Sequence, residues 1–362
     1  MDNRCSSINR RKEVSKNEQN SNSKMNKKPS TVLVTGGAGY IGIHVLLELI
    51  ANGMVPVVID NLSRGIRGLI PNSIPLIVTD IENTDVVRNT IREFNVDTVI
   101  HLAGSVVVPE SKEKPLQYYK NNVDNSRGLL EICVQEKINK FIFASTAAVY
   151  GSTKIGQLNE NAIKDPVSPY GRSKLMIEWI IKDVAAVHEL NYVILRFFNV
   201  AGADQQLRAG QVGLNNTHLI KVACEVAAGT QESIEIFGTD YPTPDGTCVR
   251  DYIHVSDLVS ALIASVKHLE SNGENSILNC GYGQGNSVRQ ILDAINKAHG
   301  TPLNIIDGKR RAGDPAVIVA DSSLIRNTLN WEPKYTSIES IVRTALAWEN
   351  SRKSLALLAE QN

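Results

Sequence analysis

The sequence predicts an α/β protein with a doubly wound parallel sheet of the Rossmann type and a smaller mixed α/β substrate-binding domain. Short runs rich in Val, Ile and Phe alternate with helical patterns, as in successive βαβ units. The runs are almost continuously apolar, which is typical of strands covered on both faces. A glycine-rich turn follows the first run. Ligands of such sheets bind at the carboxyl ends of the strands, so polar residues and glycines at those positions are the candidates for a site.

The predicted elements follow one another regularly over the first two hundred residues. The expected strands are 31–35, 55–60, 74–78, 97–102, 140–144 and 192–197, and the expected helices are 41–52, 85–94, 118–137 and 173–189. After residue 198 glycine, proline and charged residues become frequent. We therefore expect a dinucleotide-binding domain over 31–198. A mainly substrate-binding domain over 199–348, with segments returning to the first, and a tail over 349–362 complete the expected organisation.

The composition is that of a globular protein with a sizeable core. Of 362 residues, 42% are hydrophobic and 21% charged, and Lys plus Arg equal Asp plus Glu at 38 each. This balance gives no overall basic excess that would indicate nucleic acid or an acidic membrane surface as partner. No apolar run approaches the roughly 18–20 residues of a membrane helix. We expect a cytoplasmic protein that binds neither nucleic acid nor membrane.

The charge is unevenly distributed along the chain. Residues 1–30 carry eight basic and three acidic side chains, which leaves 30 basic and 35 acidic residues in the remainder. This basic arm is rich in Asn, Ser and Lys, so we expect it to be disordered. A start at Met25 would leave a chain of 338 residues, and deletion of the first 24 should leave turnover intact. Five widely spaced cysteines predict reduced thiols, and no histidine spacing predicts a metal site.

The first strand leads into a candidate dinucleotide-binding turn, TGGAGYIG at 35–42. Gly36, Gly39 and Gly42 would permit a tight turn and close approach of a pyrophosphate to the helix N-terminus at Tyr40 and Ile41. Asp60 and Asn61 end the second strand. A carboxylate there hydrogen-bonds ribose hydroxyls and repels a 2′-phosphate, which favours NAD over NADP, although Arg64 lies nearby.

The ends of the next two strands would surround the rest of the dinucleotide. These positions are Asp80, Ile81, Leu102, Ala103 and Gly104. Ordinary strand-end turns are the alternative interpretation of these residues.

A Tyr-x-x-x-Lys pair provides candidate chemistry. Tyr170 and Lys174 would share one face of a helix that begins near Ser168 and Pro169. Lowering a tyrosine pKa from 10 to about 7 requires about 4 kcal/mol, which a fixed lysine and a positive nicotinamide ring could supply. Ser145 and Thr146 directly follow the fifth strand, and Thr146 could orient a sugar oxygen toward Tyr170.

At these residues the chain resembles the UDP-glucose 4-epimerase family of the extended short-chain dehydrogenase/reductases. The resemblance covers about 31–348. It is carried by TGGAGYIG at 35–42, DN at 60–61, KPLQYYKNN at 114–122, ASTAAVYG at 144–151, SPYGRSK at 168–174, RFFNVAGA at 196–203, IFGTDYPTPDGTCVRDYIHVSDL at 236–258 and RRAGD at 310–314.

The resemblance implies C4 epimerisation of a UDP-hexose, with Tyr170, Lys174 and Thr146 as catalytic residues and hydride passing to bound NAD and back. It also implies cofactor contacts from Asn121 and Phe198. The residues that it implies for the nucleotide sugar are Asn199, His218, Leu219, Phe237, Arg250, Arg311 and Asp314. Family members are commonly homodimers, and the helices 85–94 and 118–137 are the candidates for such an interface.

Two positions depart from the pattern of some family members. Val106 stands where some carry a lysine near the cofactor. Ile318 stands where some bacterial members have a tyrosine against the sugar, and this smaller wall suggests activity on UDP-N-acetylhexosamines.

Other functions stay open at this stage. A nucleotide-sugar dehydratase or decarboxylase would need an acid or base just after Thr146, where the chain has Ala147 and Ala148. A UDP-glucuronate 4-epimerase needs only a different sugar pocket. A non-catalytic NAD-binding regulator could use the same fold. For Arg250, a surface ion pair with Asp251 is the alternative to phosphate binding.

Overall fold

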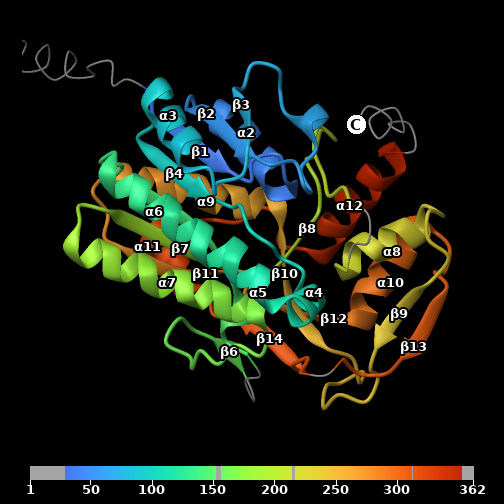
Figure 1. The fold of residues 1–362 in the computed structure, drawn as a ribbon. Coiled ribbons are helices and arrows are strands. Elements are labelled where there is room, and N and C mark those ends of the chain that lie inside the picture. Colours follow the sequence, from blue (N-terminus) through green and yellow to red (C-terminus); the bar gives the residue numbers. More distant parts are fainter. Residues whose placement is uncertain (1–28, 152–155, 214–216, 312, 353–362) are drawn as a thin grey trace, which may run out of the picture. The chain divides into compact units, whose positions relative to one another are not determined.

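The structure is a computed structural model that describes residues 29–151, 156–213, 217–311 and 313–352. Residues 1–28, most of the predicted basic arm, lie outside the described residues, as does most of the predicted tail. From Thr31 on, the described residues belong to one compact unit. The expected fold class is confirmed, because a parallel sheet flanked by helices dominates this unit (Figure 1).

The main sheet has seven parallel strands in the order β11-β7-β5-β4-β1-β2-β3. In chain order they are β1 (Thr31–Thr35), β2 (Val55–Asp60), β3 (Leu76–Val78), β4 (Thr98–His101), β5 (Lys140–Thr146), β7 (Asn191–Phe197) and β11 (Ser276–Cys280). The strand order reverses between β1 and β4, which lie side by side. Their carboxyl ends therefore meet at the switch point, where a doubly wound sheet binds its ligand.

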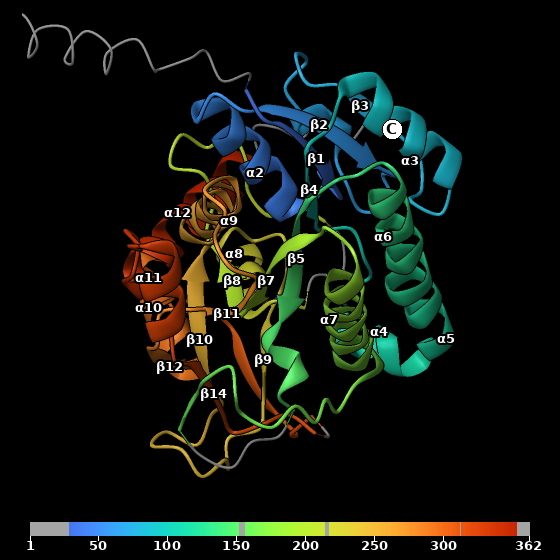
Figure 2. The same cartoon turned by 90° about the vertical axis from the view of Figure 1, so that its left-hand side faces the viewer.

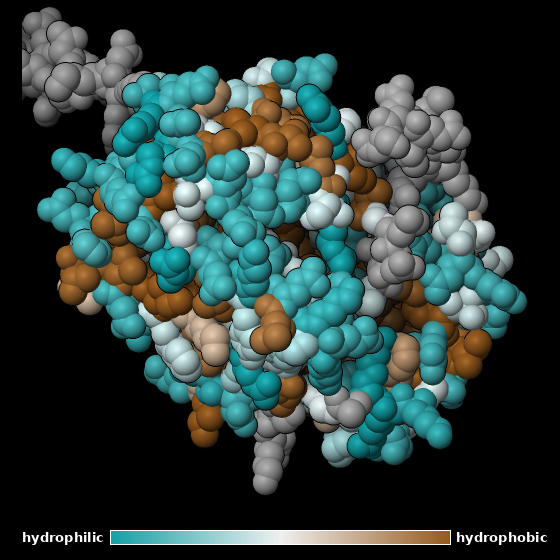
Figure 3. Space-filling model, in the orientation of Figure 1, coloured by the Kyte–Doolittle hydropathy of each residue, from teal (hydrophilic) through white to brown (hydrophobic). Residues whose placement is uncertain are grey.

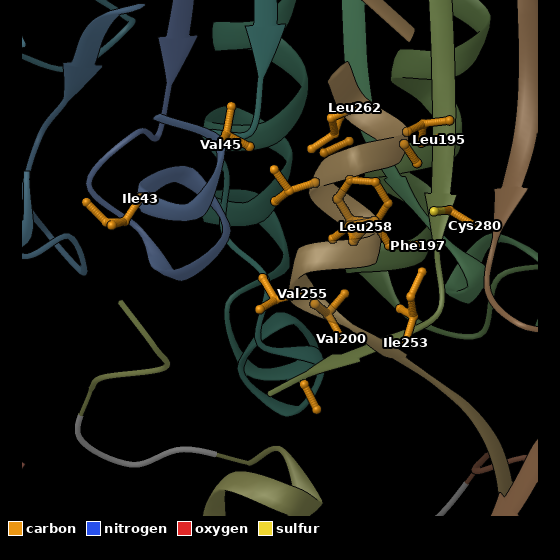
Figure 4. Packing of buried hydrophobic residues seen from close by; sticks show 14 of the residues in the cluster. Ile43, Val45, Leu195, Phe197, Val200, Ile253, Val255, Leu258, Leu262 and Cys280 are labelled. Carbon is orange, nitrogen blue, oxygen red and sulfur yellow. The ribbon is translucent and has the colours of Figure 1, made fainter. Parts of the chain in front are cut away.

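Helices cover both faces of this sheet. Figure 2 shows α6 and α7 on one side of β5 and α2 and α9 on the other. One face carries α3 (Thr84–Phe94), α6 (Asn125–Gln135) and α7 (Pro169–Val187), and the other carries α2 (Tyr40–Ala51), α9 (Val255–Glu270) and α11 (Ser323–Leu329). The two faces have separate apolar cores. In Figure 4, Leu258 and Leu262 of α9 pack near Leu195 and Phe197 of β7.

The remaining elements form a smaller, mixed part. One sheet has the order β12-β10-β14-β6, with β8 also paired to β10, and a second consists of β13 and β9. These strands are β6 (Gln157–Leu158), β8 (Asn199–Ala201), β9 (Ile234–Phe237), β10 (Val249–His254), β12 (Gly285–Ser287), β13 (Ile305–Gly308) and β14 (Val317–Ala320). Three helices pack together beside them: α8 (Leu219–Ala227), α10 (Val288–His299) and α12 (Ile338–Arg352).

The helical segment expected at 118–137 is less regular than its pattern suggested. It follows two short helices, α4 (Val108–Glu113) and α5 (Pro115–Tyr118), and begins with a π-helical stretch, η2 (Tyr119–Asp124), before α6. Single-turn 3₁₀ segments lie at η1 (Arg67–Leu69) and η3 (Ala147–Val149). A π-helical turn shifts the helix face by one residue and is frequent at functional sites. Hydrophobic periodicity alone does not reveal such a shift.

Helix α7 begins four residues before the range taken from its periodicity, at the Ser168–Pro169 start signal. The Ser168 hydroxyl accepts a hydrogen bond from the Gly171 amide at 3.1 Å, and Pro169 occupies the first turn. A serine cap followed by proline satisfies the exposed amides and presets the first helical φ. This start places Tyr170 in the first turn of the helix.

Candidate active site

The glycine turn between β1 and α2 is fixed by close backbone contacts. Gly36 has φ +73°, and a Cβ on it would lie 2.7 Å from the Ala103 nitrogen. A Cβ on Gly42 would lie 2.5 Å from the Gly36 carbonyl oxygen. The N-cap of α2 is Gly39, which contributes no side-chain cap, and the first turn carries no acidic residue. The amides at this helix start, including those of Tyr40 and Ile41, are thus suited to a phosphate.

The Tyr40 side chain itself has another role, because its hydroxyl donates to the Gly202 carbonyl at 2.7 Å. Only its backbone is placed for a cofactor. The same holds for Ile81, whose side chain is buried in the core beneath α3 and α6.

Asp60 lies where the ribose of a dinucleotide would be bound. Its two oxygens accept hydrogen bonds from the amides of Ala38, at 3.0 Å, and Leu62, at 2.8 Å. Burial raises the pKa of this carboxyl group, although both amides counteract the rise. Arg64 is paired with Glu110 at 3.2 Å. The residue that could have favoured a 2′-phosphate therefore has an acidic partner of its own.

The neighbouring strand ends are joined by side-chain amides. Asn61 donates to Asp80 at 2.8 Å, and Asn125 donates to the other oxygen of Asp80 at 3.2 Å. The predicted residues Asn61 and Asp80 are thus brought together next to Asp60.

Asn122 holds the loop after β4, a role that sequence reasoning missed. Its Nδ2 donates to the Ser105 carbonyl and to the Ser173 hydroxyl, each at 3.0 Å, and its Oδ1 accepts from the Ser105 amide at 2.7 Å. The predicted Asn121 donates to the Ser105 hydroxyl at 2.9 Å. A Cβ on Gly104 would lie 3.1 Å from Asn122 Oδ1. The paired asparagines at 121–122 were the available signal.

Lys174 is buried beside the end of β5. It is 3% exposed, its ammonium group donates to the Ala144 carbonyl at 3.0 Å, and it lies 4.8 Å from the centre of the Phe143 ring. Burial lowers the pKa of Lys174 to about 8. Its positive charge and burial together lower the pKa of His101 to about 3, with burial the larger cause. His101 is therefore a neutral side chain, hydrogen-bonded to Thr35 at 2.7 Å and Ser126 at 2.8 Å.

Tyr170 and Thr146 are brought together across the gap between α7 and β5. Burial raises the pKa of Tyr170, and a hydrogen bond with the Thr146 side chain acts in the opposite direction. Thr146 Oγ1 also accepts from the Ala148 amide at 3.1 Å, so the same hydroxyl caps the backbone after β5 and contacts Tyr170. The fold thus places Tyr170, Lys174 and Thr146 at the carboxyl end of β5.

Arg250 pairs with Asp314, and the alternative pairing with Asp251 is wrong. Arg250 Nη2 lies 2.5 Å from Asp314 Oδ1, and its Nη1 donates to the Val249 carbonyl at 2.8 Å. Asp251 faces away in the strand and accepts from the amides of Tyr282 and Gly283. Successive residues of a strand point to opposite faces, so neighbours in sequence do not meet.

Arg311 stacks on Phe237, with its guanidinium carbon 3.6 Å from the ring centre. Next to it Arg310 lies over Tyr241 and pairs with Asp240. The structure therefore joins the predicted residues into two pairs, Arg250 with Asp314 and Arg311 with Phe237.

The other predicted substrate residues lie at element starts. Asn199 is the exposed first residue of β8, directly after the buried Phe198. His218 is exposed and precedes α8, whose first residue is Leu219, and α8 packs against β9, which carries Phe237. Among the described residues, His218 forms no hydrogen bond with Arg250 or Arg311.

The described part of the chain shows neither a metal cluster nor a membrane helix. His, Cys, Asp and Glu side chains within the described ranges do not gather into a group that could hold an ion. In the same ranges every helix is too short or too polar to cross a bilayer.

Comparison with known proteins identifies the class. Residues 32–281 match the model of the NAD dependent epimerase/dehydratase family, and the chain belongs to that family. Within it, a UDP-glucose 4-epimerase of Azospirillum brasilense is 49% identical over 320 residues, which are 88% of this chain and 92% of the relative.

Solved structures agree with this assignment. A UDP-glucose 4-epimerase from Brucella ovis, crystallised with NAD, is 39% identical, with a TM-score of 0.86 over 89% of this chain and 98% of the other. A UDP-Glc/GlcNAc 4-epimerase from Campylobacter jejuni is 41% identical, with a TM-score of 0.77 over 89% and 99%. The family expected from the sequence motifs is confirmed.

The residues present fit the cofactor of this family. The glycine turn leaves space that a Cβ would fill, the start of α2 offers amides without an acidic side chain, and Asp60 stands at the ribose position. These features suit NAD.

Proposed function

We propose that this protein interconverts UDP-galactose and UDP-glucose by epimerisation at C4, in galactose metabolism. The observation that carries the proposal is the meeting of Tyr170, Lys174 and Thr146 at the end of β5, together with the arginine pairs Arg250–Asp314 and Arg311–Phe237 of the smaller part. The relatives named above supply the substrate class.

Each residue has a defined task in this proposal. Tyr170 takes the proton from the C4 hydroxyl and returns it to the same oxygen at the end. Thr146 accepts from the Ala148 amide and holds the Tyr170 oxygen by a hydrogen bond that lowers the Tyr170 pKa, and it would place the reacting sugar oxygen next to Tyr170. Lys174 holds its charge next to Tyr170 and stabilises the phenolate. The bound NAD supplies the hydride acceptor and donor and contributes a positive nicotinamide charge.

The cofactor charge and Lys174 are both needed because the Tyr170 pKa lies above its ordinary value in the protein. Burial raises it, and only the Thr146 hydrogen bond opposes the rise. We assign the remaining stabilisation of the phenolate to the cofactor charge and to Lys174.

The nucleotide part of the substrate is bound by residues of the smaller part. Arg250 would bind the diphosphate in bidentate fashion, with Asn199 beside it. Phe237, Arg311 and Asp314 would hold the uridine, with His218 and Leu219 at its edge.

The deciding experiment is conversion of UDP-galactose to UDP-glucose by purified protein without added NAD. We expect turnover by the native protein and at least a thousandfold lower kcat for Tyr170→Phe. Tyr192→Phe is the matched control, because Tyr192 is also buried but lies on β7 with no placement at the site. Inactive native protein would favour the non-catalytic alternative, and rapid turnover by Tyr170→Phe would overturn the assigned mechanism.

A second activity, on UDP-N-acetylhexosamines, is favoured by the sugar-side wall. Ile318 is half-buried and packs against a cluster that includes Ala147 and Phe198. The absence of a larger ring there leaves room for a 2-acetamido group, and the Campylobacter jejuni relative is a UDP-Glc/GlcNAc 4-epimerase by name. Ile318→Tyr should remove activity on UDP-GlcNAc while keeping that on UDP-galactose. No UDP-GalNAc from the native protein after long incubation would refute this.

We further propose a cytoplasmic homodimer. Helix α7 exposes Trp179 (55%), Met176 (36%) and Val187 (75%), and Figure 3 shows apolar surface on the side of the molecule where α7 lies. An exposed apolar face of this kind is typical of a protein interface. Its position on α7 argues for an interface of α6 and α7, so α3 would not take part. Light scattering should give a dimer for the native protein and a monomer for Trp179→Glu.

A further inference from the structure

A buried ion pair lies directly behind the catalytic face of α7. Glu178 follows Lys174 by one helical turn and Tyr170 by two, so the three side chains lie along one side of the helix. Glu178 is 1% exposed, and its partner Arg196, on β7, is 2% exposed. Charged side chains are almost never fully buried without a partner.

The two side chains meet in a bidentate arrangement. Arg196 Nη2 lies 2.6 Å from Glu178 Oε2, and Arg196 Nε donates to Glu178 Oε1 at 3.0 Å. Two parallel charge-assisted hydrogen bonds fix both distance and orientation. The pair therefore holds α7 at a set position against the central strands.

A third hydrogen bond ties the pair to the strand that carries Thr146. The Ser145 hydroxyl donates to Glu178 Oε1 at 2.5 Å. Ser145 is flanked in β5 by Thr146, the partner of Tyr170, and by Ala144, whose carbonyl accepts from Lys174. The Glu178 carboxylate thus sets the distance between α7 and β5. Across this distance Tyr170 contacts Thr146, and Lys174 contacts the Ala144 carbonyl.

The far side of the pair is anchored as well. Arg196 Nη1 donates to the Tyr150 hydroxyl at 2.9 Å, and Tyr150 donates to Asn279 on β11 at 2.6 Å. Arg196 and Ser145 are also direct partners in the β5–β7 register. The network spans three adjacent strands and α7.

We propose that Glu178 and Arg196 are positioning residues for the epimerisation, which set the distance from Tyr170 and Lys174 to the end of β5. This proposal rests on the catalytic roles assigned above. The two charges cancel each other, so the pair fixes geometry without adding a net charge behind Tyr170.

Other charged groups define the electrostatic surroundings of the pair and of Tyr170. Lys174 and neutral His101 face the catalytic side. The groups that interact electrostatically with the pair are Lys164, Glu160, Tyr150 and Tyr192, and the exposed Lys182 acts on Lys164.

Ser145→Ala tests the link to β5 without disturbing the ion pair. Glu178 Oε1 keeps its bond from Arg196, so no buried group loses its only partner. We expect kcat to fall about tenfold with an unchanged KM for UDP-galactose. The control is Ser265→Ala, which removes an equally buried hydroxyl that bonds the Ala261 carbonyl within α9. It should leave kcat unchanged.

Charge removal from either partner gives a readout that does not depend on turnover. The Tyr170 phenol of the holoenzyme can be titrated by NMR of ¹³Cζ-tyrosine, its resonance assigned by its absence in Tyr170→Phe. Glu178→Gln leaves Arg196 uncompensated and should lower the Tyr170 pKa. Arg196→Met leaves the carboxylate and should raise it. At a separation of about 12 Å along the helix, we expect shifts of about 0.5 to 1 pH unit in opposite directions.

Glu349→Gln is the matched control for burial. Glu349 is paired with Lys221 at 2.5 Å, and both side chains are as buried as the Glu178 pair. The Glu349→Gln substitution should lower the melting temperature and leave the Tyr170 titration and kcat at native values.

Native kcat in Ser145→Ala would overturn the positioning role, whatever the Tyr170 titration of the charge variants shows. Ser145→Ala serves even where a charge variant does not fold. Failure of the proposed function would give a different result from failure of the positioning role. The native protein would then be inactive on UDP-sugars, and the titration shifts would still occur.

Discussion

The residues assigned to the cofactor and those assigned to the nucleotide sugar form two walls of the proposed site, the cofactor wall and the nucleotide wall. The two walls hold their polar groups in different ways. On the cofactor wall, Lys174, Thr146 and Asn122 are held by the backbone or by buried neighbours, through contacts that do not involve a substrate. On the nucleotide wall, each arginine contacts another side chain of the protein. Arg250 pairs with Asp314, and Arg311 stacks on Phe237. The first wall is built by the fold. If Arg250 binds the diphosphate as proposed, the second exchanges partners when the nucleotide enters.

The difference follows from burial. A charge such as Lys174, 3% exposed, is costly to move, so its place must be fixed by packing. Arg311 is exposed, and the Arg250–Asp314 pair is partly exposed, so water can compensate a change of partner. We therefore expect substitutions on the cofactor wall to act on kcat and cofactor retention and those on the nucleotide wall to act on KM.

The largest effect should come from Gly42→Ala. The new Cβ would lie 2.5 Å from the Gly36 carbonyl and 2.6 Å from Gly37 Cα, and both contacts are with backbone. We expect loss of NAD from the purified protein, measured by its release on denaturation, and a lower melting temperature. Gly128→Ala in α6 is the control, because its nearest neighbour would be 3.8 Å away. Full NAD content in Gly42→Ala would show that this wall is not rigid.

The next effect should come from Lys174→Met, with kcat lower by about a hundredfold to a thousandfold. The native enzyme should show the same loss as a function of pH. The Lys174 pKa is about 8, so its positive charge is complete below that pH and is lost above it, and the phenolate loses its stabilisation. The pH profile of kcat should therefore fall on the alkaline side. Lys182→Met, on the exposed face of the same helix, should keep the native profile.

Arg250→Met should act mainly on binding. Loss of a charge-assisted phosphate contact of about 1.5–3 kcal/mol corresponds to a KM for UDP-galactose about ten to a hundredfold higher, with kcat nearly native. Initial-rate kinetics separate the two constants. A large fall in kcat with native KM would place Arg250 on the rigid wall instead.

The smallest effect, and the most specific, should come from Asp314→Asn. In this variant Arg250 does not have to break an ion pair with residue 314 before it binds a phosphate. Inorganic pyrophosphate should therefore inhibit a few-fold more strongly. UDP should not gain in the same way, because Asp314 is also assigned to the uridine. An unchanged inhibition constant for pyrophosphate would mean that the Arg250–Asp314 pair does not compete with the ligand.

Much of the cofactor wall followed from local sequence. The strand ends, the glycine turn, Asp60 and the i, i+4 spacing of Tyr170 and Lys174 are contained in short segments whose chemistry is local. The helix start at Ser168 and Pro169 was also visible. In contrast, Asn122 was missed, because its partners Ser105 and Ser173 lie in a loop and a helix far from it in sequence.

Pairings between distant segments could not be found in this way. Glu178 lies on the predicted helix face, but its partner Arg196 lies on β7, and the register of β5 and β7 brings Ser145 to the same point. Likewise, the alternation of side chains along β10 sends Arg250 to Asp314 and Asp251 to the opposite face.

The sequence by itself predicted the class of fold from the alternation of its elements. It also predicted the glycine turn and the Tyr170–Lys174 pair, because these depend on backbone geometry or spacing within one short segment. Only the tertiary structure decided which polar groups are paired and which are held ready for a ligand. Such pairing depends on strand order and burial, and these arise only when segments separated by many residues pack together.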